Sequence, residues 1–516
     1  MNFFDRLKKD IKEYPSAYLA ALMSFFLIGL GQLRNKQWYK AVPLLLIFLL
    51  YVLFEIGTSG YIYALQGELQ TYPAESGEQI YFFRDYGGFI TKGLWGLFSL
   101  GALVLGDSYR GQSIKTFDPV LTWVSADRSI DLLGNGIITV VLLTFLVAFW
   151  IFSIIDAYKT RKSTLITGEV ESAGEYFSRV WQAFFAYIIM IPAITLMMFF
   201  TIIPFLFAFL IAFTNYTYKI QTSVRLIEWV GFDSFKFIFE NPDWYKVFLK
   251  IFLWTVIWAF ASSISVYVVG FFQAIVVQSK HTVGKKAWRL LLILPWAIPA
   301  MISLMVFKNA FDKDGLINTL LYQTGTIESV NSFLRTIGLL GQEGTGIIYW
   351  FTDTFNGPLA RVVIILVNLW LGAPYFMMLI VGVLNTIPQS LYEAADIDGA
   401  NAFQKFRNIT LPRVLAATLP VIIMTFSFNF NNFGAIYFLT GGSPGWIADQ
   451  IPNSMRITGA MPGQTDILIS WIYKLSFTDG SEFYNIASVY SILIFLVVGG
   501  FSIFNLARAK NFWEED

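Results

Sequence analysis

Polar side chains inside long apolar stretches of this chain could bind a solute within a membrane. Thr425, Asn429 and Asn432 are spaced i, i+4 and i+7, which predicts that they share one face of a helix, while Asn431 points elsewhere. Asn368 lies in another apolar stretch. Amides are costly in hydrocarbon without partners, so these must face other helices or a wet cavity. They could link helices by hydrogen bonds, or they could bind the hydroxyl groups of a ligand.

Aromatic residues near Asn368 favour the second interpretation. Trp370 and Tyr375 follow it closely, and Gly372 and Pro374 predict a local break in that helix. Asparagine can donate to and accept from sugar hydroxyls, and aromatic rings can stack on the apolar faces of sugar rings. Several amides with Trp and Tyr around one cavity therefore indicate a sugar-binding site.

The sequence offers little else that could do chemistry. There is no cysteine and a single histidine, His281, which excludes thiol catalysis, disulfides and a polyhistidine metal site. We expect no catalytic residues, no metal and no cofactor bound by this chain. A Gly-x-x-x-x-Gly-Lys-Ser/Thr phosphate loop is also missing, so any ATP hydrolysis by that route needs a separate polypeptide. The net charge of +1 argues against a nucleic-acid partner.

The composition identifies an integral membrane protein. Of 516 residues, 56% are hydrophobic and only 14% are charged, against about 25% charged in soluble proteins. Runs of roughly 20 apolar residues predict about eight membrane helices and an all-α polytopic fold. These runs are 42–54 (extending past Glu55), 132–155, 181–214, 251–278, 290–307, 362–384, 414–439 and 487–507. The run 17–33 is too short to assign as spanning or re-entrant, and 94–105 is predicted to be interfacial.

Basic residues in short loops predict the orientation. The connection 279–289 contains Lys280, Lys285, Lys286 and Arg289 without an acid, which favours the cytoplasmic side. Both termini are then cytoplasmic. We divide the chain into an N-terminal accessory membrane region, 1–170, with an external segment at about 60–131, and a six-span core, 175–516.

The connection between the sixth and seventh spans, at about 388–412, predicts a short amphipathic helix with an unusual sequence. Glu393, Ala394 and Ala395 are followed by Gly399, which permits a sharp turn, and Asp398 lies between them. Nine residues separate Gly399 from Ile409, and Ile409, Leu411 and Pro412 precede the next span. This pattern resembles the EAA loop of ABC-importer permeases. In that family the loop is the coupling helix that docks on a cytoplasmic ATPase subunit, so the resemblance implies that role for Glu393, Ala394, Ala395, Asp398 and Gly399.

The resemblance extends over residues 180–510 and is densest from 294 to 442. The segments 294–299 (LPWAIP), 367–374 (VNLWLGAP), 428–433 (FNFNNF) and 439–442 (LTGG) are similar to the larger, MalF-like permease subunit of maltose/maltodextrin importers. The family's sugar contacts fall at positions that match Trp296, Ala300, Asn368, Leu371, Gly372, Tyr375, Thr425, Asn429 and Asn432; we add Trp370 from its place in the sequence. Trp296 stands where tyrosine is expected and Ala300 where serine is expected, which leaves the identity and length of the sugar open.

The resemblance implies an assembly and a location. The partners would be a second homologous permease, two ATP-binding cassette subunits that use ATP and Mg²⁺, and an extracytoplasmic sugar-binding protein. The location would be the bacterial cytoplasmic membrane. Some members carry a large external domain between the third and fourth spans, but here that connection, 215–246, is short.

Two other classes of protein are less consistent with these residues. An ion-coupled secondary transporter would need an intramembrane carboxylate or basic relay, and the centres of the six core spans contain none. An enzyme acting on lipid-linked sugars would need acids or a metal site gathered at one interface. Within the importer class, another oligosaccharide or a polyol is the alternative substrate; a phosphate ester would require Arg or Lys in the cavity.

Overall fold

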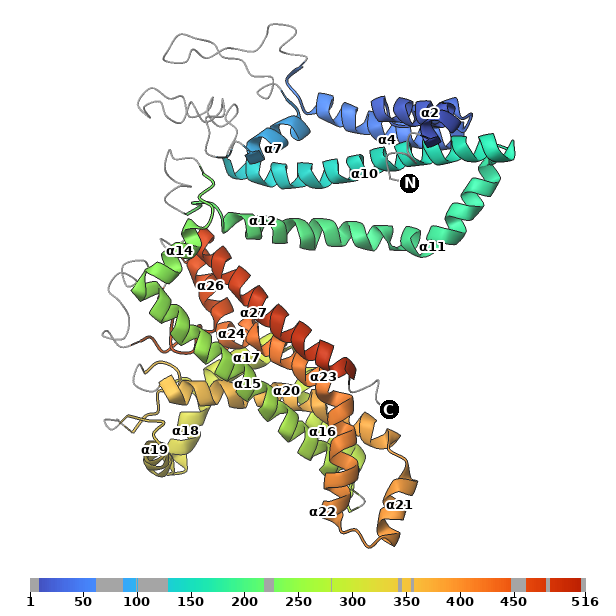
Figure 1. Cartoon of the computed structure of the whole chain (residues 1–516). Coiled ribbons are helices and arrows are strands. Elements are labelled where there is room, and N and C mark those ends of the chain that lie inside the picture. Colours follow the sequence, from blue (N-terminus) through green and yellow to red (C-terminus); the bar gives the residue numbers. More distant parts are fainter. Residues whose placement is uncertain are drawn as a thin grey trace, which may run out of the picture. The chain divides into compact units, whose positions relative to one another are not determined.

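The structure is a computed structural model that describes residues 9–61, 87–98, 100, 129–217, 227–279, 281–341, 346–353, 357–446, 461–478 and 483–511. Within these ranges the regular elements are helices, accompanied by isolated β-bridges (Figure 1). The chain forms two compact units, Met1–Gly231 and Phe232–Asp516. The functional division that we place near residue 170 stays a prediction, and most of the predicted external segment at 60–131 lies outside the described residues.

The predicted membrane helices are confirmed in number and place. Seven helices in the described ranges are long and apolar enough to cross a membrane, and a bent pair adds an eighth. The seven are Trp38–Gly57, Ile130–Thr167, Ala173–Ile211, Pro242–Gln278, Gly357–Thr386, Ala402–Phe430 and Tyr484–Phe504, and the bent pair is Lys285–Ala297 with Ala300–Ala310. The short run near the N-terminus forms α2 (Pro15–Phe26), whose 12 residues rise only about 18 Å and do not span a bilayer.

The first unit is organised around the long helix α10 (Ser129–Thr167). Helices α2 and α7 (Phe89–Phe98) pack on α10, and α4 (Trp38–Gly57) contacts α7. Glu55 in α4 accepts hydrogen bonds at 2.8 Å from the backbone N–H of both Gly88 and Ile90, so its carboxylate caps the start of α7. The unit ends with α11 (Ala173–Met197), which continues through a short π-helical turn into α12 (Ile203–Ile211).

A tight turn after α2 brings a glutamine into contact with α10. A side chain at Gly31 would place its Cβ 2.2 Å from the carbonyl oxygen of Ala20, so only glycine fits. The adjacent Gln32 is buried and donates to the carbonyl oxygen of Ser153 at 2.7 Å and to Asp156 Oδ2 at 3.1 Å. Gly31 and Gln32 lie in the short helix α3 (Leu30–Arg34) that follows this turn, and they fasten the N-terminal segment to the middle of α10.

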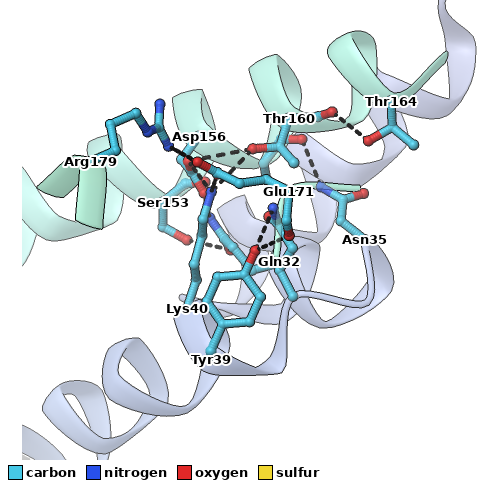
Figure 2. Close-up of polar contacts among 12 residues, drawn as sticks. Gln32, Asn35, Tyr39, Lys40, Ser153, Asp156, Thr160, Thr164, Glu171 and Arg179 are labelled. Atoms are coloured by element: carbon cyan, nitrogen blue, oxygen red, sulfur yellow. Dashed lines mark hydrogen bonds and ion pairs between the residues drawn. The ribbon is translucent and has the colours of Figure 1, made fainter. Parts of the chain in front are cut away.

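A charged cluster beside this turn joins α4, α10 and the connection before α11 (Figure 2). The side chain of Lys40 is 3% exposed, and its Nζ lies 3.1 Å from Asp156 Oδ1 and 3.4 Å from Glu171 Oε2. Glu171 also pairs with Arg179 of α11 at 2.8 Å, and the Lys40 ammonium lies 4.6 Å from the ring centroid of Tyr176. A buried lysine is thus neutralised by two carboxylates from separate segments.

The second unit is built on the contact between α15 (Pro242–Gln278) and α20 (Gly357–Thr386), against which α23 (Leu411–Phe430) packs. One buried cluster includes Phe271, Phe376 and Val414. A second buried cluster surrounds Trp258 and Ile364 and includes Ile327 and Leu334 of the short helix α19 (Ile327–Thr336). Helix α27 (Tyr484–Asn511) packs along α23.

The predicted break at Gly372 and Pro374 is wrong, because α20 continues as one helix from Gly357 to Thr386. Gly372 instead allows two helices to pack closely. A Cβ at this position would lie 2.8 Å from Val266 Cγ1 of α15, so the glycine permits close approach of the two helices. Pro374 is buried within the helix.

The break falls instead in the fifth span. Helix α16 (Lys285–Ala297) and helix α17 (Ala300–Ala310) meet at an angle of 89°, with Pro295 inside α16 and Pro299 at the start of α17. Proline removes a backbone donor and clashes with the preceding turn, which explains why a helix stops here. Irregular backbone at membrane depth is tolerated only where protein or a water-filled cavity surrounds it.

The seventh span is also shorter than predicted. Helix α23 ends at Phe430, and a separate helix, α24 (Phe433–Leu439), follows directly. After α24, residues 462–467 are buried non-helical backbone that leads into α26 (Leu468–Phe477). Asp466 anchors this segment: its Oδ2 lies 2.6 Å from Lys474 Nζ and accepts from the N–H of Gly463 at 2.5 Å.

Candidate functional site

The three predicted amides lie together and form one chain of hydrogen bonds across three elements. Asn368 Nδ2 of α20 donates to Asn429 Oδ1 of α23 at 3.3 Å, and Asn432 Nδ2 donates to Asn368 Oδ1 at 3.4 Å. Asn429 Nδ2 donates to Ser263 Oγ of α15 at 3.0 Å. The amides therefore connect helices in this conformation, and a ligand would have to replace some of these bonds.

Asn432 reaches the amide chain from a different element than predicted. Because α23 ends at Phe430, Asn432 does not share a continuous helical face with Thr425 and Asn429. It is the N-cap of α24, where its Oδ1 accepts from the N–H of Ala435 at 3.2 Å. Asn432 is half-buried, whereas Asn368 and Asn429 are buried, so Asn432 is the most accessible of the three amides.

An aromatic pair lies beside the helix break. Trp296, in the last turn of α16, stacks on Tyr375 of α20 with ring centroids 5.6 Å apart and an interplanar angle of 23°. Trp296 Nε1 donates to the carbonyl oxygen of Leu371 at 3.1 Å, yet 55% of its surface remains exposed. Trp370 packs edge-on against Phe307 of α17 at 5.1 Å. Two aromatic side chains are thus held in place while part of their surface stays accessible.

The remaining predicted residues lie around the same helices. Ala300 is exposed at the first position of α17, directly after the break. Leu371 and Gly372 are half-buried in α20. Thr425 Oγ1 donates to the carbonyl oxygen of Val421 at 2.8 Å, so its hydroxyl can still accept a hydrogen bond. The ten predicted residues carry no formal charge, and their chemistry suits a neutral, hydroxylated ligand.

Two residues that support the amide chain were not predicted from the sequence. Trp258 Nε1 of α15 donates to the backbone carbonyl of Asn429 at 2.9 Å, and Ser263 accepts from its side chain. Asn429 is consequently only 2% exposed. The signal available in the sequence was weak, since one tryptophan and one serine in an apolar helix are ordinary packing residues.

The predicted loop at 388–412 contains a helix of the expected kind. Helix α21 (Gln389–Ile397) follows α20 after two residues and has no buried residue. Glu393, Ala394 and Asp398 are exposed, and Ala395 is half-buried. Gly399 adopts a φ of 72°, so the predicted sharp turn is confirmed.

Local contacts hold α21 against the chain that follows it. Asp396 forms an ion pair with Lys405 of α22 (Ala402–Lys405), and the Tyr392 hydroxyl lies 2.8 Å from Thr410 Oγ1. Ile397 at the end of α21 is 88% exposed. An isolated, fixed helix with small and apolar exposed residues has the features of a surface that another protein covers.

No group of three or more His, Cys, Asp or Glu side chains that could hold a metal ion occurs in the part of the chain that the structure describes.

Comparison with known proteins places these features in a family. Residues 266–511 match the model of the "Binding-protein-dependent transport system inner membrane component" family. The galactooligosaccharides transport system permease protein GanP of Bacillus subtilis (strain 168) is 33% identical over 96% of this chain and 98% of its own length. The maltodextrin transport system permease protein MdxF of the same organism is 34% identical over 83% of this chain and 92% of its own.

A third relative is similar over a smaller part. The maltose/maltodextrin transport system permease protein MalF of Vibrio parahaemolyticus is 38% identical over 54% of this chain and 48% of its own length. These relatives confirm the resemblance found in the sequence. The chain therefore belongs to the permease proteins of binding-protein-dependent transport systems, and it is a multi-pass membrane protein with a transport role.

Proposed function

We propose that this chain is the sugar-conducting permease subunit of an ATP-driven importer, with neutral oligosaccharides of the maltodextrin type as substrates. The observation that carries the proposal is the break between α16 and α17, which leaves Trp296 and Tyr375 stacked and partly exposed. Tyr375 lies about two helix turns after Asn368 in α20. A site of stacked aromatics and amides without charge matches the ring faces and hydroxyls of a neutral sugar. The names of the relatives support the same substrate class.

The proposed sugar site comprises the residues predicted from the sequence. These are Trp296, Ala300, Asn368, Trp370, Leu371, Gly372, Tyr375, Thr425, Asn429 and Asn432. In this structure the amides bond to one another. A sugar hydroxyl that bonds to Asn432 would replace the Asn432–Asn368 contact at little net cost, because one hydrogen bond is exchanged for another.

The energy would come from partner subunits that dock on α21. The partners proposed are a second homologous permease, two ATP-binding cassette subunits that use ATP and Mg²⁺, and an extracytoplasmic sugar-binding protein. Residues Glu393, Ala394, Ala395, Asp398 and Gly399 would form the ATPase-facing surface. The exposure of α21 and of Ile397 supports this role.

The connections of α21 explain how such docking could move the sugar site. Only two residues separate α21 from α20, which carries Asn368 and Tyr375. On its other side the Asp396–Lys405 ion pair links α21 to the helices leading into α23, which carries Asn429. A rigid displacement of α21 would therefore reach both sides of the amide chain. This requires α21 and both termini on the cytoplasmic side of a bacterial cytoplasmic membrane, as the basic residues predict.

Uptake of labelled sugars of graded length into proteoliposomes containing the reconstituted complex tests the sugar site. Tyr375→Ala and Asn429→Ala should each reduce uptake, and Leu366→Ala, on an exposed position of the same helix, is the matched control. Equal uptake of every sugar by the wild type and both variants would remove the assigned site.

A galactooligosaccharide is the second candidate substrate. The relative named for that class matches 96% of this chain, the widest coverage among the three described above. Competition of unlabelled galactooligosaccharide against labelled maltodextrin in the same assay separates the two. Stronger inhibition by the galactooligosaccharide than by unlabelled maltodextrin would reassign the substrate.

A further inference from the structure

Four aromatic side chains form a continuous strip across the two short helices that follow the amide chain. Phe433 and Tyr437 of α24 stack with ring centroids 4.8 Å apart, and Tyr437 lies 5.2 Å from Tyr473 of α26. Tyr473 also lies 4.9 Å from Phe433 and 5.0 Å from Phe477. We call these four residues the aromatic strip.

The strip lies on the side of both helices opposite to the packed core. Within α24, Ala435, Ile436 and Leu439 are buried, whereas Tyr437 is 41% exposed. Within α26, Trp471 and Leu475 are fully buried, whereas Tyr473 is 37% exposed and Phe477 68% exposed. Each helix presents its aromatic pair at a spacing of i and i+4, so the rings line up along one face of each helix. Core packing therefore does not account for them.

The strip begins at the proposed sugar site. Asn432, which donates to Asn368, immediately precedes Phe433 and caps the helix that carries Phe433 and Tyr437. An oligosaccharide whose end bonds to Asn432 would reach the strip with its next rings.

The strip is also neutral and partly polar. The charged neighbour of Tyr473, Lys474, is turned to Asp466 at 2.6 Å. A hydrogen bond with Tyr437 raises the pKa of Tyr473, so the Tyr473 hydroxyl stays protonated at physiological pH. Rings with hydroxyls at their edges suit a sugar better than they suit the acyl chains of a lipid.

We propose that the aromatic strip is an additional subsite for the trailing rings of an oligosaccharide whose leading ring occupies the Asn368–Asn432 site. This inference rests on the proposed function. The apolar faces of the pyranose rings would lie on Tyr437 and Tyr473, and Phe477 would form the far end. A disaccharide would fill the amide site without covering the strip, so the strip would contribute more as the sugar lengthens.

The test compares maltose, maltotriose and maltoheptaose as labelled substrates for the reconstituted complex. Tyr473→Ala should lower kcat/KM for maltoheptaose by roughly three- to tenfold, the value of one lost aromatic contact, and leave maltose near the wild-type value. Tyr473→Phe keeps the ring and should restore most of the maltoheptaose uptake. Tyr322→Ala, at an exposed tyrosine of α18 (Leu316–Gln323), is the matched control and should behave as the wild type with all three sugars.

Each contrary result has a distinct meaning. An equal loss for all three sugars, accompanied by a higher half-saturating concentration of binding protein in an ATPase assay, would show that the strip contacts a protein partner and would overturn the proposal. Unchanged uptake of maltoheptaose by Tyr473→Ala, with Tyr437→Ala equally silent, would overturn it as well. A wild-type complex that transports none of the sugars would reject the proposed function together with the strip.

Discussion

Removal of the Lys40 ammonium should destabilise the first unit measurably. In Lys40→Met, the two carboxylates that face this position, Asp156 and Glu171, lose their shared cation (Figure 2). Removing one partner of a fully buried ion pair costs about 3–5 kcal/mol. Asp156 and Glu171 are 15% and 25% exposed, and Arg179 still pairs with Glu171. We therefore expect a smaller loss, about 2–3 kcal/mol of unfolding free energy.

A second variant separates charge from packing in this experiment. Lys40→Met combined with Asp156→Asn removes both members of the 3.1 Å pair and leaves the Glu171–Arg179 pair intact. It should recover most of the lost stability. The assay is denaturant-induced unfolding of the purified protein in mixed micelles. A double variant as unstable as Lys40→Met would refute the electrostatic reasoning, because volume and packing would then explain the loss.

Three further substitutions test other parts of the fold. Gly372→Ala should lower the unfolding free energy by about 1–3 kcal/mol, because the added methyl group overpacks against α15. Gly382→Ala, in the same helix but with open space around it, should not lower the unfolding free energy. Equal effects of the two substitutions would mean that helix propensity dominates. Glu55→Gln should speed hydrogen exchange of the amides at the start of α7, since a charge-assisted cap is lost; unaltered exchange would remove the capping role. Asp466→Asn should lower the unfolding free energy by about 2–3 kcal/mol, because its paired lysine, which is 25% exposed, is left without a counter-charge. Thermal unfolding in detergent checks this, and a wild-type midpoint would contradict it.

The membrane helices were predictable because each is a long run of side chains that only a bilayer or a core tolerates. The positions of the helix breaks were predicted less well. Gly372 and Pro374 suggested a break, but the glycine serves close packing against Val266, which depends on a helix more than a hundred residues away. The actual break between α16 and α17 has a local signal in Pro295 and Pro299, which lie within the predicted span 290–307.

The sequence predicted which residues lie in the candidate site, but not which hydrogen bonds join them. Amides in apolar helices must find partners, so Asn368, Asn429 and Asn432 were expected near one another, and the structure brings them together. That they bond to each other and to Ser263 follows from the packing of α15, α20 and α23, which no local pattern encodes. The charged cluster of the first unit could not be predicted from the sequence for the same reason, because Lys40 and Asp156 are 116 residues apart.

The central claim is that this permease depends on an ATP-hydrolysing partner that docks on α21, and sugar accumulation in proteoliposomes tests it most directly. The chain would be reconstituted with its partner permease and binding protein, with or without the ATPase subunits and ATP, and as wild type or Glu393→Lys. We expect accumulation against a gradient only for the wild type with ATPase and ATP, and none for Glu393→Lys although it inserts normally. Accumulation without the ATPase, or undiminished accumulation by Glu393→Lys, would contradict the account.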